Sequence, residues 1–121
     1  MKLKILPDAF TVCKLPAETD FDAKVPFCFL ARTDEECSLV CPTSLTPSCT
    51  IAREDGWKAF RIEGVLDFGL VGILARIAVI LADNGIPIFA VSTFNTDYLL
   101  IKEPSFEKAV ELLCENGYEL S

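Results

Sequence analysis

Hydrophobic and polar positions follow two different patterns along the chain. Before residue 46 the apolar residues come in short runs without a helical period, which is typical of β-strands. We expect these strands at residues 3–6, 9–15, 27–31 and 37–41. Pro7 and Asp8 predict a turn between the first two strands, and residues 33–35 predict the turn of a hairpin between the last two.

Residues 46–56 divide the chain, because proline, serine, aspartate and glycine gather there and predict a loop. Beyond this loop, segments with the strand period alternate with segments that have the helix period. Strands are expected at residues 57–62, 87–94, 97–102 and 118–120, and helices at residues 69–84 and 105–116. Asp67 lies at or just before the N-cap of the first helix, and Gly85 and Gly117 follow the two helices as stops. The order β-α-β-β-α-β predicts an α+β, ferredoxin-like fold with both helices on one face of an antiparallel sheet.

The two expected helices differ in the face that they leave outside. The second helix has one apolar stripe, formed by Phe106, Ala109, Val110, Leu113 and Cys114. The first helix has an apolar face and, opposite to it, a face of mainly small residues, namely Gly72, Ala75, Val79 and Ala82. We interpret this small-residue face as a second contact surface, to another subunit or to the N-terminal half. The alternative is a surface that merely carries short side chains.

Composition and charge limit the classes of function. The chain has 121 residues, of which 51% are hydrophobic, so it holds one compact domain or two very small ones and is not a disordered protein. The formal net charge of −7 disfavours binding to nucleic acids and to anionic membranes. The N-terminus does not read as a signal peptide, and the longest apolar stretch, residues 70–82, is too short to span a bilayer. We therefore expect a cytoplasmic protein.

The chain has no histidine, which excludes Ser-His-Asp and Cys-His catalytic arrangements. It also has no glycine-rich phosphate loop and no familiar lysine or carboxylate motif, although catalysis by lysine or carboxylate side chains stays open at this point. No cofactor is expected. In the cytoplasm its thiols would be reduced, and most free cysteines are small buried hydrophobic residues. An all-thiolate zinc site is the alternative interpretation, and it would use Cys28, Cys37, Cys41 and Cys49.

Two segments could bind a small ligand. Residues 64–72 carry glycines into the first turn of the expected helix, where unpaired amides attract an anion. Asp67 has the right sign for an ammonium group, so the segment suits an α-amino acid, although Asp67 could instead be a helix cap. Residues 92–97 are mostly hydrogen-bonding residues at the end of an apolar strand, where they form either a ligand-binding edge or an ordinary hairpin turn.

The second half resembles an ACT domain. The similarity rests on residues 70–74 after the glycine-containing loop, on residues 84–86, and above all on the run Ser-Thr-Phe-Asn-Thr-Asp-Tyr-Leu-Leu-Ile at residues 92–101. More narrowly, the chain resembles the small tandem ACT-like proteins related to aspartate-kinase regulatory domains and to CASTOR-type arginine sensors. The resemblance implies an ACT domain at residues 53–121, preceded at residues 1–52 by a reduced, mostly β ACT-like unit.

The resemblance also implies a non-catalytic regulatory module that binds an amino acid at an ACT interface, as a homodimer and with a possible protein partner. The implied ligand-binding residues are Val65, Leu66, Asp67, Phe68, Gly69, Leu70, Val71, Gly72, Thr93, Phe94, Asn95, Thr96 and Asp97. In this assignment the amides of residues 69–72 hold the carboxylate, and Asp97 or Asp67 holds the ammonium or a cationic side chain. Phe94 and Phe68 form the walls of the pocket. A structural or protein-interaction module of the same fold, without a small-molecule ligand, is the alternative.

Overall fold

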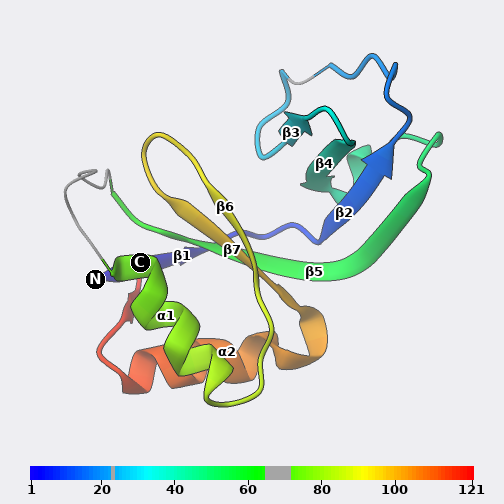
Figure 1. The fold of residues 1–121 in the computed structure, drawn as a ribbon. Helices are drawn as coiled ribbons and strands as arrows, with labels where there is room; N and C mark the ends of the chain where they lie inside the picture. Colours follow the sequence, from blue (N-terminus) through cyan, green and yellow to red (C-terminus); the bar gives the residue numbers. More distant parts are fainter. Residues whose placement is uncertain (23, 65–71) are drawn as a thin grey trace. The chain divides into compact units, whose positions relative to one another are not determined.

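The computed structural model describes residues 1–22, 24–64 and 72–121, which form two compact units (Figure 1). The C-terminal unit comprises Met1–Pro7 and Lys58–Ser121, and the N-terminal unit comprises Asp8–Trp57. The units meet between Trp57 and Lys58, whereas the sequence led us to expect the boundary between residues 52 and 53. The first strand of the chain belongs to the C-terminal unit, because it pairs with strands of that unit.

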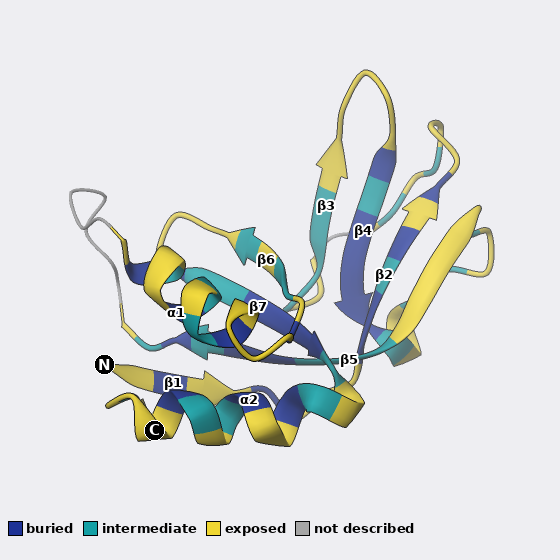
Figure 2. Cartoon of the chain, turned by 60° about the horizontal axis from the view of Figure 1, so that its bottom comes forward, coloured by how far each residue is buried: buried dark blue, intermediate teal, exposed yellow. Residues whose placement is uncertain are grey.

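The C-terminal unit is a sheet with two helices on one face (Figures 1 and 2). Its elements are β1 (Lys2–Ile5), the second half of β5 (Ala52–Ile62), α1 (Ile73–Ala82), β6 (Phe89–Ser92), β7 (Asp97–Lys102), α2 (Glu103–Glu115) and β8 (Glu119–Leu120). Hydrogen bonds join the strands in the order β6-β7-β5-β1-β8. The predicted α+β class and the β-α-β-β-α-β order are therefore confirmed, with β1 as an additional strand.

Strand β1 changes the expected sheet. It pairs in antiparallel fashion with β5, which places Leu3 opposite Ile62, and in parallel fashion with β8, which places Lys2 opposite Glu119. The expectation of a wholly antiparallel sheet is therefore wrong for the last strand. Burial of Leu3 stabilises β1 in this position, because the Leu3 side chain is fully buried among the residues that face the helices.

The core of the C-terminal unit follows from the two periods of the sequence. Residues of the core recur at every second position on β5 and β7 and at every three or four positions on the helices, so both face one interior (Figure 2). This core contains Leu3, Phe60, Ile62, Ile73, Ile77, Leu81, Ile86, Leu99, Ile101, Phe106, Ala109 and Leu113. Cys114, which we expected in the buried stripe of the second helix, is exposed instead.

Both helices begin at positions other than those expected. Helix α1 starts at Ile73, and Gly72 is its N-cap with a left-handed φ of 79°. A side chain at Gly72 would meet no atom within 4 Å, so the backbone angle requires the glycine and close packing within the chain does not. Helix α2 starts at Glu103, two residues before the expected start, because Pro104 fits the first turn of a helix.

The N-terminal unit contains strands and, among its described residues, one short 3₁₀ helix. Its elements are β2 (Phe10–Leu15), β3 (Phe29–Arg32), β4 (Cys37–Pro42), η1 (Thr43–Leu45) and the first half of β5. The predicted hairpin is confirmed, since β3 and β4 pair in antiparallel fashion. Its small core combines three buried thiols with two leucines, namely Cys13, Leu15, Cys37, Leu39 and Cys41.

The expected loop at residues 46–56 is partly strand, because β5 begins at Ala52. The pairing with β2 shifts register between Phe10 and Val12, which lie opposite Trp57 and Glu54. Strand β5 therefore has one extra residue at Asp55–Gly56, and Gly56 has a left-handed φ of 84°. The Asp-Gly pair that predicted a loop forms a β-bulge. Within the described residues, no helix is long and apolar enough to cross a membrane.

Candidate functional site

A small polar cavity lies where β5 ends and β7 begins. Its volume is about 230 Å³, and its described lining consists of Arg61, Glu63, Gly64, Asn95, Thr96 and Tyr98. Arg61 comes from the end of β5, and Glu63 and Gly64 follow that strand directly. The others come from the hairpin between β6 and β7 and from the start of β7. The described lining therefore includes Gly64, the first residue of the segment 64–72 that the sequence indicated, and two residues of the segment 92–97.

The alternation of side chains along a strand determines which face of the sheet the polar residues of this cavity occupy. Phe60 and Ile62 face the helices, so Arg61 and Glu63 lie on the opposite face of the sheet. On β7, Leu99 faces the helices and Tyr98 shares the face of Arg61. Because β5 and β7 are hydrogen-bonded neighbours, the three polar side chains gather at one place.

The arginine of the cavity is held by two contacts. Arg61 Nη1 donates to the Tyr98 hydroxyl oxygen at 3.3 Å, and Arg61 Nε donates to a Glu63 carboxylate oxygen at 3.5 Å. The hydrogen bond to Tyr98 is the main reason that the pKa of the Arg61 guanidinium is raised above its ordinary value. The side chain is therefore a permanent cation. It can bind an anion, and the neighbouring carboxylate can bind a cation.

The hairpin beside the cavity is fixed by its threonines. The Thr96 hydroxyl is buried and donates to the carbonyl oxygen of Ile62 at 2.7 Å, which fastens the hairpin to β5. The Thr93 hydroxyl donates to the carbonyl oxygen of Thr96 at 3.0 Å and closes the turn. The site thus has a rigid border on this side, although the Thr96 hydroxyl is already used by the backbone.

The residues predicted for ligand binding fall into three groups. Asn95 and Thr96 line the cavity. Thr93, Phe94 and Asp97 belong to the same hairpin but not to the described lining: the Phe94 side chain is 77% exposed, and Asp97 accepts a hydrogen bond of 2.6 Å from the Ser92 hydroxyl. Residues 65–71, which include Asp67, Phe68 and the glycine at 69, lie outside the described residues.

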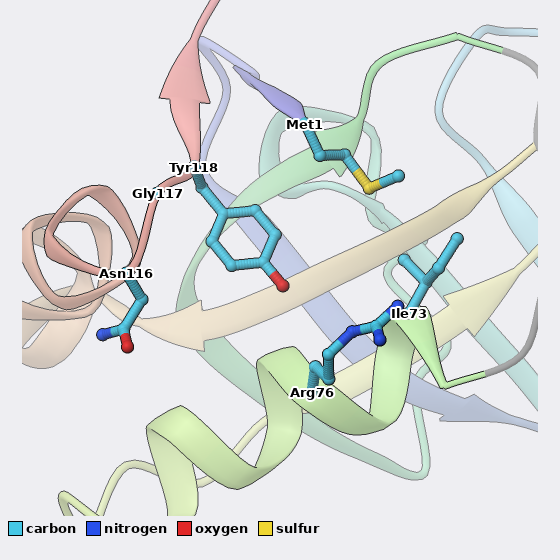
Figure 3. A pocket seen from close by; sticks show the side chains of 6 residues that line it. All are labelled: Met1, Ile73, Arg76, Asn116, Gly117 and Tyr118. Atoms are coloured by element: carbon cyan, nitrogen blue, oxygen red, sulfur yellow. The ribbon is translucent and has the colours of Figure 1, made fainter.

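Gly72 lies away from this cavity, at a groove beside α1. Two adjoining hollows of about 300 and 490 Å³ share Arg76, Asn116 and Tyr118 in their lining. Figure 3 shows the smaller hollow, in which the Tyr118 ring points toward Arg76. The larger hollow adds Gly72, Ala75, Val79 and Ile80, which include three residues of the predicted small-residue face. This face is therefore the wall of an open groove in the C-terminal unit.

The sequence patterns did not indicate Arg61, Glu63 or Tyr98 as site residues. The available signal was the alternation of charged and apolar residues in residues 60–63, which marks a strand with one polar face. That pattern does not reveal the neighbouring strand, so the meeting of Arg61 with Tyr98 depends on the pairing of β5 with β7.

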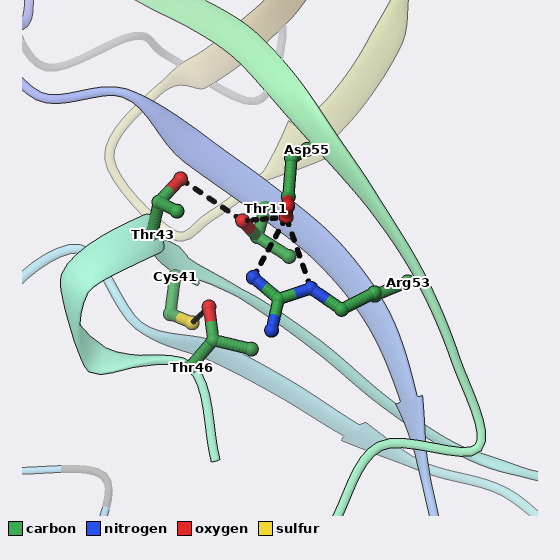
Figure 4. A network of polar contacts seen from close by, with 6 residues as sticks. All are labelled: Thr11, Cys41, Thr43, Thr46, Arg53 and Asp55. Atoms are coloured by element: carbon green, nitrogen blue, oxygen red, sulfur yellow. Dashed lines mark hydrogen bonds and ion pairs between the residues drawn. The ribbon is translucent and has the colours of Figure 1, made fainter. Parts of the chain in front are cut away.

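A second polar cluster lies in the N-terminal unit (Figure 4). The buried Thr11 hydroxyl oxygen is 2.6 Å from a carboxylate oxygen of Asp55 and 2.9 Å from the hydroxyl oxygen of Thr43. Arg53 donates to the same Asp55 oxygen from two of its nitrogens, at 2.9 and 3.1 Å. These contacts fix the bulge of β5 against β2, so we assign the cluster to the fold.

The cysteines of the alternative zinc site are in different environments. Cys37 and Cys41 are buried, Cys28 is half-buried and Cys49 is exposed, and all are free thiols. Among the described residues, no three or more cysteine or acidic side chains are grouped so that they could hold a metal ion. Cys41 instead contacts the Thr46 hydroxyl, with 3.7 Å between sulfur and oxygen.

Comparison with known proteins gives a family and a fold. Residues 52–115 match the family model described as ACT domain. A crystal structure of a protein from Agobacterium tumefaciens is 35% identical in sequence, with a TM-score of 0.87, and the match covers 99% of this chain and 91% of that one. No curated protein matches the sequence.

Two aspartate kinase structures share the fold at lower identity. The crystal structure of aspartokinase α and β subunits has a TM-score of 0.64 at 15% identity, over 95% of this chain and 96% of that chain. The aspartate kinase of Clostridium acetobutylicum, described as an allosteric enzyme, has a TM-score of 0.63 at 18% identity. That match covers 91% of this chain but only 32% of the enzyme, so this chain corresponds to a minor part of it.

Proposed function

The chain belongs to the ACT-domain family, and from this premise we propose that it is a regulatory module that binds an amino acid or a similar small metabolite. It acts in the cytoplasm and does not itself catalyse a reaction. The observation that carries the proposal is the polar cavity between β5 and β7, which offers a guanidinium, a carboxylate and an amide to one small ligand.

The cavity has the size and the chemistry for such a ligand. Its volume of about 230 Å³ lies below the ~300–1,000 Å³ of pockets for drug-sized molecules, as befits a metabolite of amino-acid size. Its described border combines opposite charges, so a molecule with both an anionic and a cationic group matches it. Asn95 adds an amide that can both donate and accept hydrogen bonds.

A thermal-shift screen of the purified protein against the twenty amino acids and several nucleotides tests the proposal. A ligand that binds the native state stabilises it, by about 2.7 kcal/mol when its concentration is 100 times Kd. We expect a saturable rise in Tm with one or a few amino acids and no rise with the nucleotides. An unchanged Tm with every amino acid at millimolar concentration would contradict the proposal.

The groove beside α1 favours a second candidate function, which is association with another protein chain. Val79 is 57% exposed there, and Ala75 and Ile80 continue the apolar wall. We propose that a second copy of this chain covers this face, so that the module is a homodimer. Light scattering should give the mass of a dimer for the wild type and of a monomer for Val79→Lys. A monomeric wild type would remove this part of the proposal.

A further inference from the structure

Two cationic residues are cross-strand neighbours at the polar cavity between β5 and β7. Arg61 on β5 is directly opposite Lys4 on β1, and such cross-strand partners point to the same face of the sheet. Like charges in this position repel each other and destabilise the pair of strands. The arrangement occurs in a chain whose net charge is −7, so it does not follow from a general excess of cations. An anion bound at Arg61 would relieve this repulsion.

The contacts of Arg61 orient its guanidinium without neutralising it. Its distances of 3.3 Å to the Tyr98 hydroxyl oxygen and 3.5 Å to the Glu63 carboxylate are at the long end of hydrogen bonding. Charge-assisted pairs of full strength are shorter, at about 2.7–2.9 Å. A carboxylate that approaches the guanidinium from the cavity can therefore form a stronger contact than those that Arg61 already makes.

Glu63 supplies the opposite charge on the same border. Its side chain is 36% exposed, and its contact with Arg61 is the longer of the two contacts of that arginine. The distance between the two charged groups is of the order of a few ångströms, as is the distance between the ammonium and the carboxylate of an α-amino acid. A zwitterion can thus replace one weak ion pair by two stronger ones.

We propose that Arg61 binds the carboxylate of an α-amino acid in this cavity and that Glu63 binds its ammonium group. The assignment rests on the proposed function and makes it specific. The guanidinium donates to the carboxylate, and the ammonium donates to the Glu63 carboxylate. Lys4 adds positive charge on the side of the carboxylate. The required ligand is a free α-amino acid, because an amine without the carboxylate or an acid without the ammonium fills only half of the site.

The test compares Arg61→Gln with a matched variant, Arg53→Gln. Each arginine lies on β5, two residues before its acidic partner, but Arg53 belongs to the cluster in the N-terminal unit. The probes are the L-amino acids that stabilise the wild type, used in isothermal titration calorimetry. We expect Arg61→Gln to raise Kd about 10- to 100-fold, which corresponds to loss of a charged hydrogen bond, and Arg53→Gln to leave Kd within about 2-fold.

A second measurement needs no variant. For each amino acid that binds, the matching amine and the matching carboxylic acid are titrated into the wild type; for L-leucine these are 3-methylbutylamine and 4-methylpentanoate. Both analogues should bind at least about 10-fold more weakly than the amino acid. This result supports the assignment even where Arg61→Gln fails to fold.

The outcomes separate the two proposals. If an amino acid binds the wild type and Arg61→Gln equally, or if the amine binds as well as the amino acid, the assignment of Arg61 is overturned and the proposed function remains. If no amino acid binds the wild type, both are overturned.

Discussion

An arginine followed two residues later by an acidic residue occurs twice along β5 and its end, once in each unit, with different results. A guanidinium nitrogen of Arg53 lies 2.9 Å from a carboxylate oxygen of Asp55, and the same oxygen accepts a hydrogen bond from the Thr11 hydroxyl. Arg61 and Glu63 remain 3.5 Å apart and border a cavity. Exposure does not explain the difference, since the tighter pair is the more exposed, at 38% and 52% against 25% and 36%.

The difference comes from the partners that the neighbouring strands bring. In the N-terminal unit, the buried hydroxyl of Thr11 needs an acceptor, so Asp55 is held in place and Arg53 follows it. In the C-terminal unit the neighbour is Tyr98, whose hydroxyl contacts the arginine and leaves the carboxylate looser. We therefore assign the Arg53–Asp55 pair to the stability of the fold and the Arg61–Glu63 pair to ligand binding.

The largest expected effect is the difference in stability between Asp55→Ala and Glu63→Ala. Asp55→Ala removes an acceptor from Arg53 and from the buried hydroxyl of Thr11, so the free energy of unfolding should fall by about 1–3 kcal/mol. Glu63→Ala breaks a looser pair and should cost less than about 1 kcal/mol. Urea denaturation followed by circular dichroism measures both values.

For amino-acid affinity, we expect the larger effect from Glu63→Ala, the variant with the smaller effect on stability. Glu63→Ala should weaken amino-acid binding, and Asp55→Ala should leave it unchanged in protein that remains folded. Equal losses of stability in the two variants would show that the pairs are equivalent and would remove the basis of the comparison.

A smaller effect is expected where the hairpin is fastened to β5. Thr96→Val keeps the shape of the side chain but removes the donor to the Ile62 carbonyl oxygen, at 2.7 Å. The free energy of unfolding should fall by about 1 kcal/mol. Thr93→Val removes the hydrogen bond that closes the turn, but at an exposed residue, so the expected loss is smaller, below about 0.5 kcal/mol. A Thr96→Val variant whose free energy of unfolding equals that of the wild type would contradict the role given to this hydrogen bond.

The effect that is smallest at neutral pH concerns the thiol core of the N-terminal unit and develops only at alkaline pH. Burial, aided by nearby Cys41, raises the pKa of the Cys13 thiol to about 11. Below about pH 8.5 the folded and unfolded chains both keep this proton, so the thiol does not make stability depend on pH. Between that pH and about 11 the unfolded chain loses the proton and the folded chain keeps it, so stability falls as pH rises.

Thermal melts between pH 8 and 11 measure this slope in the wild type and in Cys13→Ala. The slope should be shallower in the variant, whatever its stability at neutral pH. Cys114→Ala, which removes an exposed thiol of α2, serves as the control. Identical slopes in the wild type and Cys13→Ala would show that this buried thiol does not link stability to pH.

Much of the fold could be predicted because its signals are local. The helix period of residues 73–82 and 103–115 and the glycines at 85 and 117 suffice to place both helices within a few residues. The hairpin at residues 93–96 follows equally from its threonines and asparagine.

The rest depends on pairing, which the sequence does not specify locally. Four residues at the N-terminus predict a strand, but they do not indicate that it will insert between β5 and β8. Asp55 and Gly56 have the composition of a loop, and only the register with β2 makes them a bulge. For the same reason the sequence indicated the hairpin residues Asn95 and Thr96 but not Arg61 and Tyr98, which line the same cavity.

The claim that the polar cavity between β5 and β7 is the ligand site is tested most directly by nuclear magnetic resonance. In this experiment, ¹⁵N-labelled protein is titrated with the amino acid that raises the wild-type Tm most. We predict that the Arg61 Nε–H, the side-chain amide of Asn95 and the backbone amide of Gly64 shift saturably together, while the signals of Arg53 and Thr11 stay in place. Shifts confined to the cluster around Arg53, or to the groove beside α1, would contradict the claim that this cavity is the ligand site.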